Sequence, residues 1–246
     1  IGYAALNAQN LTTSIDAFNV AVGVNAGVSV TTGVQNTLIG AGAGDALTVG
    51  QENVALGYLA LSSDDVGNHS TAIGHGALFS QNYATATDSN NTAVGYNCGN
   101  QIQTATNNTL IGAEAGDALT DGSENVAVGT QALSTEDGHG QNTAVGMQAL
   151  RDLNAGATGN NTAVGHIAGR LLSTGILNTF VGASAGATAT TVSNNTAVGA
   201  FAFDAGTGAD NTAVGSGALG GSSNSAANNV AIGKDAGNSV STGAQN

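Results

Sequence analysis

The sequence predicts an all-β protein, a parallel β-solenoid of about fourteen coils, and three observations lead to this prediction. A short motif recurs along the whole chain, with a spacing of mostly 17 residues. The repeats are rich in glycine, asparagine and β-branched residues, and they sustain no 3.6-residue period. A repeat this short cannot enclose a core, so neighbouring repeats must stack and bury one continuous interior.

The motif is Asn, Thr or Val, a small residue, an aliphatic residue and Gly, with Ala three residues later. It reads NTLIGAGAG from Asn36, NTAVGYNCG from Asn91 and NVAIGKDAG from Asn229. We interpret residues 1–246 as a single repeat array in which the motif is the best strand of each coil. The motif glycines are Gly2, Gly23, Gly40, Gly57, Gly74, Gly95, Gly112, Gly129, Gly146, Gly165, Gly182, Gly199, Gly215 and Gly233.

The motif columns indicate which way each strand residue faces. Three positions before the glycine every complete repeat has Val or Thr, and one position before it every repeat has Val, Ile or Leu. These two columns share a face, and the residue between them, on the other face, is Ala in ten of thirteen repeats and Leu38, Leu110 or Phe180 in the rest. We take the aliphatic column as the main buried column. Because a coil has only one interior, we expect identical chains to cover the second apolar side.

Asparagine stands four positions before the glycine in twelve of thirteen repeats, and Ser70 replaces it in the other. We expect each Asn to adopt the left-handed conformation at a turn and to hydrogen-bond its own turn and the Asn of the next coil. The alternative is a polar ligand-binding stripe, although a buried ladder has no donors left over. The predicted structural ladder consists of Asn19, Asn36, Asn53, Asn91, Asn108, Asn125, Asn142, Asn161, Asn178, Asn195, Asn211 and Asn229.

A second, longer period is superimposed on the spacing of mostly 17 residues. Four positions after the glycine the residues follow a Leu, Gly, Gly, Leu order, which predicts a super-repeat of four coils and about 70 residues. The bulky Leu38, Leu110 and Phe180 occur in repeats that have Gly at this later position, which suggests volume compensation in a close-packed interior. Longer coils recur nearly every fourth repeat, and their extra residues are expected to bulge from the surface. These segments are 7–18, 80–90, 151–160 and 220–228.

Charge and cysteine content exclude several classes. Three basic residues, Arg151, Arg170 and Lys234, against sixteen acidic residues give a net charge of −13. We therefore expect no nucleic-acid partner and no attraction to anionic membranes. No apolar run is long enough to cross a bilayer. The single Cys98 allows no internal disulfide and no paired-thiolate zinc site, and we expect it to be a small buried hydrophobe.

The stretch NNVAIGKDAG, from Asn228 to Gly237, and its relatives along the chain resemble the repeat of trimeric autotransporter adhesin heads. The strand portion of that consensus matches STAIG at 70–74 and NVAIG at 229–233. Similar NTAVG arrays occur in phage tail fibres and in fibre proteins of predatory bacteria. The repeats here are a few residues longer than the adhesin type, and residues 1–246 contain no pattern of the coiled-coil stalk, neck or membrane anchor of that family.

The resemblance implies a left-handed parallel β-roll in a homotrimeric, extracellular fibre, on a bacterial cell surface or in a virion tail fibre. The expected partners are two identical chains and a host-surface glycan or protein. Since the chain begins and ends inside a motif, we expect it to be a window of a longer fibre.

Two of the four histidines are candidate metal ligands. His75 and His166 directly follow motif glycines but lie five coils apart, too far to share a metal within one chain. Around a threefold axis each could form a ring of three that binds zinc or an anion. We favour exposed or interface imidazoles, and we expect His69 and His139, which fall between strands, to be solvated. The sequence therefore predicts no metal site.

Acidic pairs at Asp64–Asp65 and Glu136–Asp137 lie beside glycines in turns. Carboxylates in glycine turns can bind calcium, yet neither the EF-hand loop nor the calcium-binding nonapeptide occurs. We interpret these pairs as solvated turn charges. No Ser, His and Asp set and no phosphate-cradling GxxxxGK[ST] appears, and we therefore expect neither an enzyme nor a cofactor site.

Three functions remain as hypotheses, and the first is the structural and adhesive region of a homotrimeric fibre. The second is an ice-binding solenoid, because nine of thirteen repeats have Thr in one column. Against it, this column shares a face with the aliphatic column and is interrupted by valine. The third is a glycan-binding shaft in which Tyr3, Tyr58 and Tyr96 provide stacking platforms. The interrupting valines are Val20, Val54, Val126 and Val230.

Overall fold

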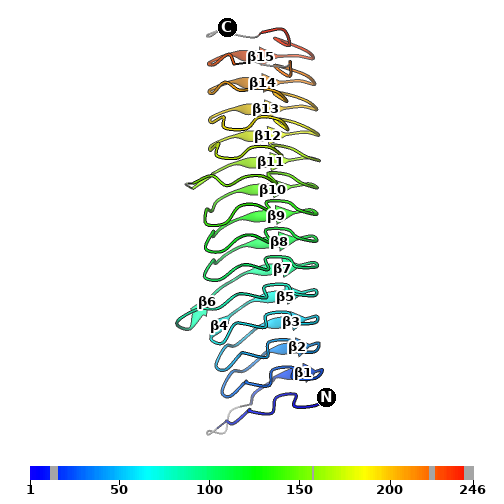
Figure 1. Ribbon diagram of the computed structural model, residues 1–246, viewed down its shortest axis with the longest axis vertical. Helices are drawn as coiled ribbons and strands as arrows, with labels where there is room; N and C mark the ends of the chain where they lie inside the picture. The colour runs from blue at the N-terminus through cyan, green and yellow to red at the C-terminus, as the bar shows by residue number, and fades with distance from the viewer. Residues whose placement is uncertain (12–15, 157, 222–224, 241–246) are drawn as a thin grey trace. The chain divides into compact units, whose positions relative to one another are not determined.

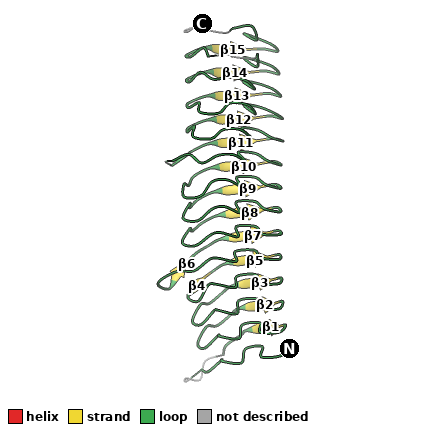
Figure 2. Cartoon of the chain, in the orientation of Figure 1, coloured by secondary structure: helices red, strands yellow, loops and turns green. Residues whose placement is uncertain are grey.

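The computed structural model describes residues 1–11, 16–156, 158–221 and 225–240, and these residues are all-β (Figure 1). Short strands alternate with turns, and none of the described residues is helical (Figure 2). The chain divides into two compact units, Ile1–Glu124 and Asn125–Asn246. Each unit is a stack of coils in which every coil contributes one strand to a parallel sheet.

In the first unit six strands pair in parallel and in register, so that equivalent motif residues lie side by side. A second, two-stranded parallel sheet lies beside them, formed by β4 (Gly67–Asn68) and β6 (Thr87–Asp88). The six strands are β1 (Val20–Val22), β2 (Thr37–Ile39), β3 (Val54–Leu56), β5 (Thr71–Ile73), β7 (Thr92–Val94) and β8 (Thr109–Ile111).

The second unit repeats this arrangement with seven strands among its described residues. Ala163 pairs with Phe180, and Phe180 with Ala197, in one continuous column. Both units are parallel β-solenoids, which confirms the predicted fold class. The strands are β9 (Val126–Val128), β10 (Thr143–Val145), β11 (Thr162–Val164), β12 (Thr179–Val181), β13 (Thr196–Val198), β14 (Thr212–Val214) and β15 (Val230–Ile232).

The interior of each coil is formed by the column that is mostly alanine. Ala72, Leu38 and Phe180 are fully buried, whereas Leu56 on the other side of its strand is 41% exposed. The interpretation of the Val, Ile and Leu column as the main buried column is therefore wrong. The mostly small residues of the middle column therefore face inward, and the β-branched and aliphatic residues on either side of it in each strand face outward.

Glycines make room for the few large residues of this inner column. A Cβ on Gly44 would lie 2.8 Å from Leu38 Cδ2, and one on Gly27 would lie 2.6 Å from Leu38 Cδ1. Phe180 stands in the same relation to Gly169 and Gly186. The expected volume compensation is present, and it involves the preceding coil as well as the residue's own coil.

Two of the segments expected to bulge turn partly inward. Tyr83 is 5% exposed and donates a hydrogen bond to the carbonyl oxygen of Ala105. In the segment 151–160, of which residue 157 is not described, Leu153 and Ala155 are buried. The other two segments include residues 12–15 and 222–224, which lie outside the described part of the chain.

The motif glycines bring the backbones of successive coils into contact. Gly165 has a φ of 144°, which side chains disfavour, and a Cβ there would overlap the carbonyl oxygen of Gly182. The same relation joins Gly182 to Gly199 in the next coil. Only glycine can occupy this column, because both the conformation and the close approach exclude a side chain.

We predict that Gly165→Ala lowers the free energy of unfolding by about 3 kcal/mol or more, because it combines backbone strain with steric overlap. Gly138→Ala is the matched control: a Cβ there would meet nothing within 4 Å. Its thermal midpoint should stay close to that of the wild type. Differential scanning calorimetry of both variants tests this, and equal midpoints would contradict the proposed role of the column.

Candidate functional site

The motif asparagines form a hydrogen-bonded column inside the coils. The Asn36 backbone N–H donates to Asn19 Oδ1 at 2.8 Å, and Asn53 donates in the same way to Asn36 Oδ1 at 3.0 Å. The Asn36 side-chain amide donates to the carbonyl oxygen of Gly50 at 2.9 Å. In the second unit the same backbone contact links successive ladder residues from Asn125 to Asn229. The column uses its amides internally, which favours a structural role over a ligand-binding stripe.

The left-handed residue at this turn is the one before the asparagine. Gln35, Glu52 and His69 have φ values of 60°, 58° and 59°. The expectation that the asparagine itself is left-handed is wrong. The preceding residue turns the chain into the strand, and the asparagine side chain then points inward to the carbonyl oxygens. Residue type does not mark this position as left-handed, because the column contains Gln, Glu, His and Leu as well as Asn.

A buried polar network surrounds Ser70, which interrupts the ladder. The Ser70 and Ser89 hydroxyls lie 2.6 Å apart, and Gln81 Nε2 donates to Ser70 Oγ at 2.7 Å and to Asp64 Oδ2 at 2.6 Å. Asn91 Nδ2 donates to Gln81 Oε1 at 3.0 Å and so restores the column. Segment 80–90 of the next coil thus supplies Gln81 and Ser89, whose polar groups take the place of the asparagine side chain that is missing at Ser70.

Asp64 is not the solvated turn charge that the sequence suggested. Its side chain is fully buried, and Oδ1 accepts a hydrogen bond from the Gly67 backbone at 2.9 Å. Desolvation raises the pKa of Asp64, and the hydrogen bonds from Gln81 and Gly67 oppose that shift. Its neighbour Asp65 also has a buried carboxylate oxygen.

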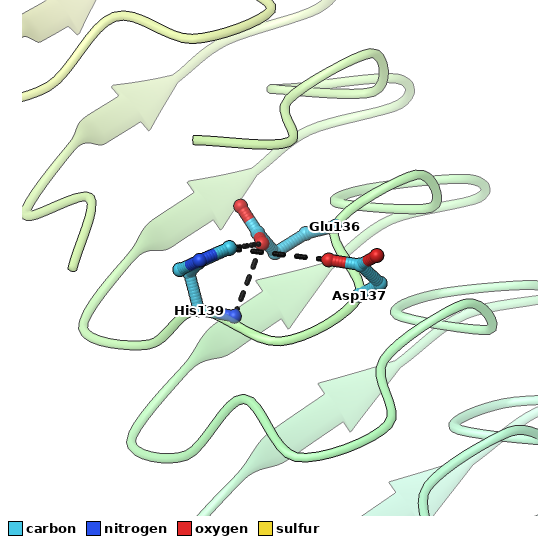
Figure 3. Close-up of side chains that lie close together, drawn as sticks. All are labelled: Glu136, Asp137 and His139. Atoms are coloured by element: carbon cyan, nitrogen blue, oxygen red, sulfur yellow. Dashed lines mark hydrogen bonds and ion pairs between the residues drawn. The ribbon is translucent and has the colours of Figure 1, made fainter. Parts of the chain in front are cut away.

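A second buried carboxylate belongs to a cluster of Glu136, Asp137 and His139 in the second unit (Figure 3). Glu136 is fully buried, and its Oε1 lies 2.8 Å from His139 Nδ1 and accepts from the His139 backbone at 3.1 Å. Its Oε2 accepts from the Ala155 backbone at 3.2 Å. Burial raises the pKa of Glu136, whereas the hydrogen bond and the charge of His139 lower it.

The expectations for this turn are therefore only partly right. The Asp137 side chain is 56% exposed, as expected for a turn charge, but Glu136 is buried and the His139 side chain is only 25% exposed. Asp64 and Glu136 share one column, seven positions after a motif glycine, where other coils have buried Leu47, Ile102 or Leu153. Aligning the repeats at this position would have revealed both carboxylates.

His75 and His166 are exposed, and the structure gives them different surroundings. The His75 ring lies between the rings of Tyr58 and Tyr96, with centroid distances of 5.3 Å on each side. One face of each tyrosine is thus packed against imidazole and not open to a sugar. Of the predicted glycan platform, Tyr58 and Tyr96 keep only the outer faces of this stack, whereas Tyr3 is 79% exposed and lies outside it.

His69 is half-buried and not simply solvated. Its Nε2 lies 3.3 Å from Glu52 Oε2, and its Nδ1 lies 3.4 Å from Asp88 Oδ1.

Cys98 is fully buried, and its thiol donates to the Leu110 carbonyl oxygen at 3.2 Å. Desolvation raises the pKa of Cys98 to about 12, which keeps the thiol protonated and unreactive.

The largest candidate site is the outward side of the strands. We call it the outward strip, defined as the residues three and one positions before each motif glycine from Val20 to Ile232. Thr, Val, Ile and Leu alone occupy these positions, so the strip carries no charge. Val22 is 39% exposed and Val164 is 37% exposed, and the strand register aligns each with its equivalents. Both units thus present an apolar and hydroxyl-bearing ladder.

Comparisons with protein families, with curated proteins and with solved structures return no match. The outward strip and the cluster in Figure 3 therefore have to be interpreted from their own chemistry. Among the described residues, no helix has the length and apolar character needed to cross a membrane.

We predict that stability falls as pH rises through about 6, because of Asp117. Burial raises the pKa of Asp117 from 3.8 to about 6, and its buried Oδ1 has no hydrogen-bond partner among the described residues. Between these values the folded state binds more protons than the unfolded state, so this contribution is present below pH 4 and lost above about pH 6. Thermal midpoints of the wild type and Asp117→Asn across this range test it, and parallel pH profiles would contradict it.

Proposed function

We propose that this chain is the structural and adhesive repeat region of a homotrimeric extracellular fibre that displays or supports binding to a host-surface glycan or protein. Such a fibre would belong to a bacterial cell surface or to a phage tail. The proposal depends chiefly on one observation, the uncharged outward strip with its exposed Val164 and Leu56. The role requires no catalysis by the chain itself.

The strip has the character of an interface between chains. Ordered rows of exposed aliphatic side chains are uncommon on monomeric proteins and mark contact surfaces. Similar side chains, Thr or Val and then Val, Ile or Leu, recur in each coil of the strip, so a second copy presents a matching row at the same spacing. The sixteen acidic residues lie outside the strip, and their charge is therefore kept away from the proposed contact.

A threefold arrangement about an axis along the stack would bring three strips together. Each coil would then add one more layer of the same contact, so that the interface grows with the number of coils. The motif resemblance supports three copies over two. In such a trimer the contact between strips would bury apolar surface area in addition to the small area that the alanine-rich interior of each chain buries.

Size-exclusion chromatography with light scattering tests the proposal. We expect a particle of three times the chain mass of 23.6 kDa. Val164→Lys places a charge in each strip, and we expect it to dissociate the particle because the ammonium groups would be desolvated at the contact. Thr174→Lys is the control, since Thr174 is exposed and lies between strands. A monomeric wild type, or a trimeric Val164→Lys variant, would contradict the proposal.

The structure also favours one alternative, an ice-binding solenoid. The threonines lie on the exposed side of the strands, and Thr179, Thr196 and Thr212 align in register. Parallel strands are about 4.8 Å apart, so the hydroxyl and methyl groups form a regular array. The threonine column shares a face with the aliphatic column, which in the sequence argued against ice binding, but in the structure this face is the outer one. The valine interruptions remain.

Thermal hysteresis separates the two functions, because one strip cannot bind both ice and sister chains. Under the fibre proposal we expect no hysteresis and no inhibition of ice recrystallisation by the purified chain. Hysteresis that disappears in Thr196→Lys but persists in Thr174→Lys would instead establish the ice-binding function and overturn our assignment of the strip.

A further inference from the structure

The cluster of Glu136, Asp137 and His139 is not needed by the proposed fibre. Glu136 occupies a core column in which the next two coils have buried Leu153 and Leu172. A carboxylate in that position loses its hydration and is costly unless it is paired. A buried carboxylate that replaces an aliphatic residue beside an imidazole is a candidate for a functional site.

The three side chains already converge. Their potential ligand atoms all lie within 4.8 Å of one another. His139 Nδ1 is 2.8 Å from Glu136 Oε1 and 3.9 Å from Asp137 Oδ1. Ligand atoms around a tetrahedral zinc ion lie about 3.4 Å apart, a spacing that follows from metal–ligand distances of about 2.1 Å. The two measured distances bracket this value.

The turn leaves space for solvent to complete a coordination shell. A Cβ on Gly138, between the two ligand-bearing residues, would meet no heavy atom within 4 Å apart from those of Asp137 and His139 themselves. Asp137 and His139 reach the surface, whereas Glu136 anchors the inner side through Oε2 and the Ala155 backbone. Figure 3 shows the side chains pointing toward one another across this turn.

The donor set selects the kind of metal. One imidazole nitrogen and two carboxylates suit zinc and neighbouring divalent transition metals. Calcium takes six to eight oxygen ligands, which this turn does not offer. In the first unit the corresponding carboxylate is Asp64, which accepts a hydrogen bond from Gln81 Nε2. The nearby His69 contacts Glu52 and Asp88 and not Asp64. Among the described residues, only the turn of Glu136 combines these donors.

We propose that Glu136, Asp137 and His139 bind one divalent transition-metal ion of the zinc class, with water completing its coordination. His139 binds through Nδ1 and retains its proton on Nε2, and Glu136 binds as the carboxylate, so any proton displaced from either site leaves to solvent. The ion replaces the direct contact between Glu136 Oε1 and His139 Nδ1. Because Glu136 also holds the Ala155 backbone, binding fastens the turn to the next coil.

Titration of the chelator-treated full chain with zinc chloride tests the proposal by calorimetry and by thermal midpoint. We expect one zinc ion per chain, and a higher midpoint with zinc. His139→Gln and Asp137→Asn should each weaken zinc affinity at least about tenfold. His166→Gln, which alters an exposed histidine of the same unit, should bind zinc as the wild type does.

Cobalt absorption spectra provide a second readout, because ligation by His139 changes the spectrum and a merely structural role does not. Absence of zinc binding by the wild type, or undiminished binding by Asp137→Asn and His139→Gln together, would overturn the proposal. If His139→Gln fails to fold, the exposed Asp137→Asn decides alone. These outcomes do not depend on the number of chains in the particle.

Discussion

The backbone contact at the motif glycines is the constraint on which the rest of the structure depends. With a φ of 144° at Gly165 and the Gly182 carbonyl directly against its α-carbon, no side chain fits between successive coils. This contact fixes the spacing and the register of the strands. The asparagine column repeats the same registration by hydrogen bonds, such as the one that the Asn178 backbone N–H donates to Asn161 Oδ1 at 3.0 Å. Every other column then stacks on its own equivalents.

The stacking of equivalent residues explains why alanine fills most of the inner column and how the few larger or polar residues are accommodated. Alanine suffices for most of the inner column, and a larger residue such as Phe180 is accommodated by glycine in its own and the preceding coil. Polar exceptions follow the same rule. Ser70 is bridged by Gln81, and Glu136 is matched by His139. Ser70 and Glu136 each lie in a 17-residue coil that directly precedes a longer one, and residues of the longer coil help to satisfy them: Gln81 contacts Ser70, and the Ala155 backbone donates to Glu136.

The repeat made the fold class predictable, because glycine spacing and β-branched composition leave few alternatives. It did not reveal which strand face is inside. Alternation places Ala163 and Val164 on opposite faces but, since both faces are apolar, does not tell which is buried; in the structure Ala163 is buried and Val164 is 37% exposed. Turn composition alone predicts solvated carboxylates at Asp64 and Glu136, whereas the buried Leu47, Ile102 and Leu153 in the same column indicate that both are buried. The stack of His75 between Tyr58 and Tyr96 is predictable from the sequence, since all three residues directly follow motif glycines of successive coils.

The central claim is that the outward strip is where identical chains meet. Pulsed dipolar spectroscopy tests it most directly with one nitroxide label, attached to cysteine in His166→Cys, at an exposed position beside the strip and not in it. The background is Cys98→Ala, which restores the alanine that other coils have at that position. Our account predicts a strong coupling between chains with a single short distance, because three labels converge on one axis. A signal without dipolar coupling between chains would contradict it.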